Sequence, residues 1–181
     1  MNQLHISNRR RQSGAILITS LLLLLVLTVL GVVMMQTTRM QERMAGATRD
    51  LSLAVQGAEA GLRYGESIVS TLAAPDGTGT LPCTVCQPGT LPVAIYDPAQ
   101  FDWNANAQVY GASAAVTAAL TNSGLTENPH YTVESLGFVR DSLNEGQEPP
   151  EGRDFFQISS RSTGATGLAN TVLQSTYARR F

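Results

Sequence analysis

The chain has 181 residues, of which 14% are charged, and a formal net charge of −2. All twelve basic residues are arginine; three of them precede Gly14, whereas all fourteen acidic residues follow it. The part after Gly14 therefore carries nine arginines against fourteen acids, a net charge of −5. This charge excludes a nucleic-acid-binding protein that relies on a basic face.

An uncharged segment of 21 residues, residues 15–35, follows Arg9–Arg11 and the short stretch Gln12–Gly14. Fourteen of the 21 are Leu, Ile or Val, which favours membrane insertion by roughly 4–8 kcal/mol at most. A helix of about 20 apolar residues crosses the hydrocarbon core of a bilayer, so we predict a transmembrane helix over residues 15–35. The three arginines are expected to stay in the cytoplasm, which places the rest of the chain across the membrane.

Three alternatives describe the fate of this segment. A secretory signal would be cut after its apolar core, and the nearest small-residue site is Ala45–Ala47, beyond three charged residues. An uncleaved anchor would keep the whole chain. Cleavage between Gly14 and Ala15 would remove only a basic leader, residues 1–14, and leave the apolar segment attached.

A second helical segment is predicted over residues 36–74. Apolar residues recur there at steps of three, four or seven, which indicates one stripe on a helix. We expect the stripe to pack on the domain core from Leu51 to Leu72, and on a helix of another subunit from Met34 to Met44. Glycines weaken the helix by about 1 kcal/mol each relative to alanine, so a local break near Gly46 is expected, and Pro75–Gly77 ends it.

The segment Asp76–Pro98 is rich in Pro, Gly and Thr and is predicted to be a surface loop of the domain formed by residues 75–181. It contains the only two cysteines, Cys83 and Cys86. Cysteine pairs outside the cytoplasm are usually oxidised, so we predict a disulfide. Thiol–disulfide exchange is the alternative, but a reactive thiolate needs a helix N-terminus, and Pro82 and Pro88 flank the pair.

No metal, cofactor or catalytic site is predicted. Two thiols lack a second pair of zinc ligands, and His130 is the only histidine after the leader. The segment Asp102–Asn106 is similar to the start of a calcium loop, but the sixth position is Ala107 instead of Gly and the twelfth is Ser113 instead of Glu. We expect a turn there, with the nearby aromatic residues in or beside the core, and a short helix at 113–121.

The end of the chain changes to a strand pattern. Tyr131–Arg140, Phe155–Arg161 and Leu168–Tyr177 are predicted as strands. Asp141–Asp154 and Ser162–Gly167 are the connections. An antiparallel sheet over residues 131–177, packed on the long helix, gives an α+β domain.

The sequence resembles a type IV pilin, and specifically a PilX-type minor pilin. The resemblance covers about the first 66 residues and the last ten, and is carried by Gly14 before the apolar run, Leu21–Leu30, Gln41–Gly46, Ala54–Ala60 and Leu173–Ala178. It implies that prepilin peptidase cuts after Gly14, so that Ala15 becomes the N-terminal residue and receives the family's methylation.

One position departs from the family pattern. Major pilins carry a glutamate at the fifth position after the cut, where this chain has Thr19. Among minor pilins, its absence is typical of the PilX-like members and of those similar to pseudopilin K, which are assigned to the filament tip. An uncharged Thr costs less than an ionised Glu in apolar surroundings, and its hydroxyl can bond to its own helix backbone.

The resemblance implies a structural subunit that primes type IV pilus assembly and supports twitching motility and attachment. Its partners would be other minor pilins, the major pilin, prepilin peptidase and the inner membrane, with no nucleic acid and no small-molecule substrate. The protein would reside in the inner membrane with its domain in the periplasm, and then in the surface pilus. The alternatives are a minor pseudopilin of type II secretion and a membrane-anchored periplasmic thiol–disulfide oxidoreductase.

Overall fold

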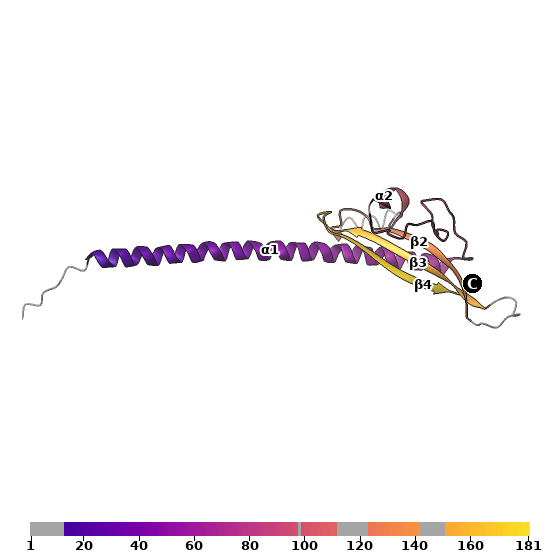
Figure 1. Ribbon diagram of the computed structural model, residues 1–181, viewed down its shortest axis with the longest axis horizontal. Helices are drawn as coiled ribbons and strands as arrows, with labels where there is room; N and C mark the ends of the chain where they lie inside the picture. Colours follow the sequence, from indigo (N-terminus) through magenta and orange to yellow (C-terminus); the bar gives the residue numbers. More distant parts are fainter. Residues whose placement is uncertain (1–12, 98, 112–122, 142–150) are drawn as a thin grey trace, which may run out of the picture. The chain divides into compact units, whose positions relative to one another are not determined.

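Figure 1 shows a computed structural model of the protein, which describes residues 13–97, 99–111, 123–141 and 151–181. The chain divides into two compact units, Met1–Gly46 and Ala47–Phe181. The predicted α+β class is confirmed, because one long helix is combined with a four-stranded antiparallel sheet in the order β1-β2-β3-β4. The short helix expected at 113–121 lies outside the described residues.

The helix α1 covers Ser13–Thr71 and ends shortly before the predicted proline stop. Its sequence contains no proline, and leucine and alanine, two of the strongest helix formers, are frequent in it. The helix continues through Gly46, so the turn there is not melted. A glycine in one exposed turn lowers helix stability by only about 1 kcal/mol, which the neighbouring turns offset.

The line along which α1 contacts the domain coincides only in part with the predicted stripe. Leu51 was expected in the core but is 51% exposed, so that assignment is wrong. Two positions of the predicted stripe, Ala58 and Val69, are buried as expected. The other buried positions lie outside the predicted stripe: Asp50, Ala54, Gly57, Gly61 and Gly65. Small residues form most of this line, and the larger side chains Val55 and Leu62 flank it half-buried.

Three glycines at intervals of four explain why small residues occupy the contact line. A Cβ atom added at Gly57 or Gly61 would lie 2.3 Å from the hydroxyl of Ser162 or Ser160. One added at Gly65 would lie 2.6 Å from a methyl group of Ile158. The helix therefore approaches β3 more closely than any larger side chain would permit.

The three long strands occur where the sequence predicts strands, with different ends. They are β2 (His130–Arg140), β3 (Gly152–Thr163) and β4 (Asn170–Arg179), joined as antiparallel neighbours. Asp154, Ser162 and Thr163 belong to β3 rather than to connections, because β3 pairs with β2 and β4 along this length. Leu168, by contrast, lies outside β4.

The sheet has a fourth strand whose position the sequence did not indicate. The two-residue strand β1 (Gln108–Val109) pairs with the start of β2, where Val109 lies opposite His130. Two residues carry no alternation that a sequence can show, so only the pairing with β2 reveals this strand. It follows the one-turn helix α2 (Trp103–Asn106), whose N-cap residue Asp102 accepts hydrogen bonds from two backbone N–H groups. The segment compared with a calcium loop is thus a capped helical turn.

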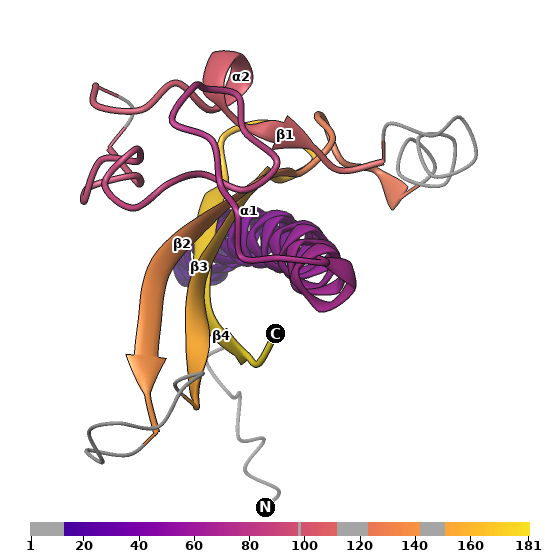
Figure 2. The ribbon, with the colours of Figure 1, turned by 90° about the vertical axis from the view of Figure 1, so that its right-hand side faces the viewer.

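One face of the sheet is covered by α1, and part of the other face is covered by chain without regular secondary structure (Figure 2). The part of α1 after Gly46 packs on one face, where Val69, Val133, Phe156 and Ile158 form a fully buried cluster. Chain between α1 and β1 covers part of the other face and contributes a second cluster that includes Ile95, Phe101 and Trp103. The segment predicted as a surface loop is thus part of the core, because its apolar side chains replace a second layer of secondary structure.

Candidate functional site: apolar helix surface and disulfide loop

The junction Gly14–Ala15 lies in the first turn of α1, and both residues are exposed. A Cβ atom added at Gly14 would meet no atom within 4 Å. Packing among the described residues therefore does not explain a glycine at this position.

Apolar side chains surround α1 on all sides after this junction. The large apolar residues from Ile16 to Met35 are between 45% and 68% exposed. It is the one helix among the described residues that is long and apolar enough to span a membrane. A helix that is apolar all around needs either lipid or other apolar helices as its surroundings.

Thr19 satisfies its hydroxyl group within the helix. Its Oγ1 lies 3.1 Å from the carbonyl oxygen of Ala15 and 3.0 Å from that of Ile16, both of which accept from it. Thr28 donates to Leu25 in a similar way. The Thr19 side chain is therefore uncharged and hydrogen-bonded within its own helix.

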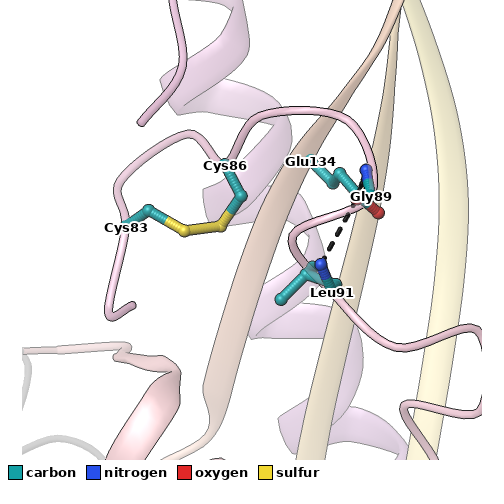
Figure 3. Close-up of a disulfide and its surroundings, with 5 residues drawn as sticks. All are labelled: Cys83, Cys86, Gly89, Leu91 and Glu134. Atoms are coloured by element: carbon teal, nitrogen blue, oxygen red, sulfur yellow. Dashed lines mark hydrogen bonds between the residues drawn. A yellow bond between two sulfur atoms is a disulfide. The ribbon is translucent and has the colours of Figure 1, made fainter. Parts of the chain in front are cut away.

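Cys83 and Cys86 are joined by a disulfide (Figure 3). Backbone hydrogen bonds fasten the second cysteine to the edge of β2: the N–H of Cys86 donates to Val133, and the N–H of Ser135 donates to the carbonyl of Cys86, at 2.7 and 2.9 Å. Beyond the disulfide, the Glu134 carboxylate accepts hydrogen bonds from the N–H groups of Gly89 and Leu91 (Figure 3). The cysteine loop is thus attached to the sheet at three points.

This arrangement does not favour exchange chemistry at the cysteines. Both are buried, with Cys83 4% exposed and Cys86 not exposed at all, whereas a reactive cysteine is partly exposed and stabilised as a thiolate. Neither cysteine lies at the N-terminus of a helix among the described elements. The geometry instead gives the disulfide a structural role in the loop.

Within the described part of the chain, no group of three metal-ligating side chains comes together. The histidine considered in the sequence, His130, begins β2 and is half-buried. Burial is the main factor that lowers its pKa, and the positive charge of Arg161 lowers it further. A neutral, half-buried imidazole of this kind needs no catalytic explanation.

A contact that the sequence did not reveal joins α1 to the turn between β3 and β4. The Asp50 carboxylate accepts from the N–H of Thr166 at 3.0 Å and from its hydroxyl at 2.5 Å. These bonds lower the pKa of Asp50 below its usual value. Gly164 in the same turn is required, because an added Cβ would lie 2.4 Å from the Asp50 carboxylate. Asp50 looks in the sequence like one more exposed charge on a helix.

Comparison with known families covers most of the chain. Residues 13–63 match the PilX N-terminal family, and residues 69–179 match the C-terminal family described as type IV pilus assembly protein PilX. No curated protein and no solved structure matches the chain. The first match includes the Gly14–Ala15 junction and the apolar helix surface, and the second includes the disulfide loop and the whole sheet. The chain therefore belongs to the PilX family of type IV pilus assembly proteins.

Proposed function

We propose that this chain is a minor pilin, a structural subunit that primes type IV pilus assembly and is incorporated near the filament tip. The observation that carries the proposal is the apolar surface of α1, which is exposed on every side from Ile16 to Met35. Lipid covers this surface before assembly, and the helices of neighbouring subunits cover it afterwards. Membership of the PilX family indicates that the assembly in which this helix takes part is that of the type IV pilus.

Processing is the second part of the proposal. Prepilin peptidase cuts between Gly14 and Ala15, the new N-terminus is methylated, and the apolar helix remains attached. The domain then faces the periplasm until the subunit enters the pilus and reaches the cell surface. Twitching motility and surface attachment depend on the chain through the pili that it helps to start.

The position near the tip rests on Thr19. In the family's major members, the glutamate at this position is thought to pair with the terminal amine of a neighbouring subunit. Thr19 carries no charge for such a pair, and its hydroxyl already donates to its own helix. A subunit at the end of the filament has fewer neighbours, so it has less need of this pairing.

Deletion of the gene tests the proposal. We expect surface pili to be lost while the major pilin persists in the membrane, and expect the wild-type gene to restore them. Secretion of exoproteins, measured in the same strains, should be unchanged. Normal piliation together with lost secretion would instead identify a type II pseudopilin.

A further inference from the structure

A cavity of about 270 Å³ lies on the sheet face opposite α1. Its apolar walls are formed by Leu91 and Ile95, from the chain between α1 and β1, and by Leu136 of β2. Its polar groups come from the sheet, where Glu134 on β2 lies opposite Gln157 on β3. The cavity thus combines an apolar wall with a carboxylate.

The carboxylate of Glu134 is buried without a cation. Its residue is 8% exposed, and the two described hydrogen bonds, from Gly89 and Leu91 at 2.8 and 3.4 Å, both go to Oε1. None of the three ion pairs among the described residues involves Glu134. The cavity lining contains no Arg, Lys or His. Buried charges in proteins are normally paired, and no described residue supplies a positive group to Glu134.

We propose that the cavity receives an arginine or lysine side chain from another subunit of the filament. These side chains bury their aliphatic part along apolar surface while the charged end pairs with a carboxylate. Here the aliphatic part packs on Leu91, Ile95 and Leu136, and the cation meets Glu134 beside the amide of Gln157. The source of the side chain rests on the proposed function, whereas the chemistry of the site does not.

The first experiment tests the site alone. Butylguanidinium, which reproduces an arginine side chain, is titrated into the isotope-labelled full chain in detergent, and the amide NMR signals of Gly89 and Leu91 are followed. These two N–H groups donate to Glu134, so a bound cation should shift them progressively. Neutral butylurea of the same shape should shift them at least roughly tenfold less at equal concentration.

The variant Glu134→Gln removes the charge and keeps an oxygen that can accept from Gly89 and Leu91. We expect its affinity for butylguanidinium to fall roughly tenfold or more, whereas Glu151→Gln, at an exposed position, should bind like the wild type. Equal shifts with butylurea, unchanged affinity of Glu134→Gln, or no shift at all would each overturn the proposed cation site.

The second experiment tests the source of the side chain. Val93 lines the cavity and is fully exposed, so a photo-crosslinking residue placed there samples its entrance in piliated cells. We expect a cross-linked peptide from a pilus subunit that contains Arg or Lys, and we expect Glu134→Gln to abolish it. Cation binding in the first experiment without this cross-link would overturn the subunit as the source and leave the minor-pilin function intact.

Discussion

A single carboxylate, Asp50, joins α1 to the turn between β3 and β4. It accepts two hydrogen bonds from Thr166, and Gly164 leaves the space for this contact. The bonds favour the ionised form, so the pKa of Asp50 lies below the ordinary value of 3.8. The stabilisation is therefore complete above that value and disappears as the pH falls through the lower pKa of the folded state.

The pH dependence of Asp50→Asn tests this contact. Asn is uncharged and has only one side-chain oxygen, so it cannot replace the Asp50 carboxylate as acceptor of both hydrogen bonds from Thr166. We therefore expect the Asp50→Asn variant to have a lower Tm than the wild type at about pH 6. The difference should shrink near pH 2, because this pH lies below the ordinary value of 3.8. The carboxyl group of the unfolded wild type is then protonated, and folding to the ionised form has to remove that proton. Thermal unfolding followed by circular dichroism measures the difference. An equal difference at both pH values would show that the charge of Asp50 contributes nothing.

At the scale of elements, the packing of α1 on the sheet depends on glycines rather than on large apolar residues. Gly65→Ala places a methyl group 2.6 Å from a methyl of the fully buried Ile158. We expect it to lower the free energy of unfolding by about 1–3 kcal/mol, the usual cost of overpacking. Denaturant unfolding of the purified chain in detergent measures the change.

Gly46→Ala is the matched control for this variant. It is also on α1, but its added Cβ would meet no atom within 4 Å. We expect it to be neutral or to stabilise by up to about 1 kcal/mol, because alanine favours a helix. If both variants had the same effect, helix propensity and not the close approach to β3 would decide stability.

The disulfide loop is the second element with a testable role. Replacing Cys83 and Cys86 by serine should lower the free energy of unfolding by about 2 kcal/mol, since the disulfide closes only a short loop. Reductant should destabilise the wild type and leave the serine variant unaffected. The buried sulfurs also lead us to expect no insulin reduction by the wild type, and rapid reduction would support the oxidoreductase alternative instead.

At the scale of the whole molecule, the sequence predicts those helices and strands that have a regular pattern of apolar residues. The apolar run, the continuous helix and the three long strands all have a period that one chain shows by itself. Contacts between distant residues have no such signal. Three features arise only when segments far apart in the sequence meet: the Asp50–Thr166 contact, the hydrogen bonds from the cysteine loop to Glu134, and the strand β1.

The face of α1 that packs on the sheet is the clearest example of a feature that apolar periodicity predicts poorly. Its large apolar residues indicate a stripe through Leu51, but the sheet is approached by glycines and alanines because small residues allow closer contact. Hydrophobic periodicity ranks Leu51 above Gly57 and Gly61, so it selects the flank of the interface. The segment Asp76–Pro98 was likewise predicted to be a surface loop, although its Val85 and Ile95 are buried.

The two compact units of the chain need different surroundings. The first presents apolar side chains that water solvates poorly, and the second has its own core. In a filament subunit, the apolar helix is covered by neighbouring helices while the domain faces water. Our central claim is that the apolar helix stays attached to the domain after the leader is removed. Gly14→Val should block cleavage without disturbing the chain itself, because the added atoms have open space.

N-terminal analysis of the chain in sheared pili and in membranes, from cells with and without prepilin peptidase, tests this claim most directly. We predict that the chain in pili begins at Ala15, and that the uncut chain stays in the membrane when the peptidase is absent or Gly14 is replaced by Val. A mature chain that begins after Met35, or the same N-terminus in both strains, would contradict the account.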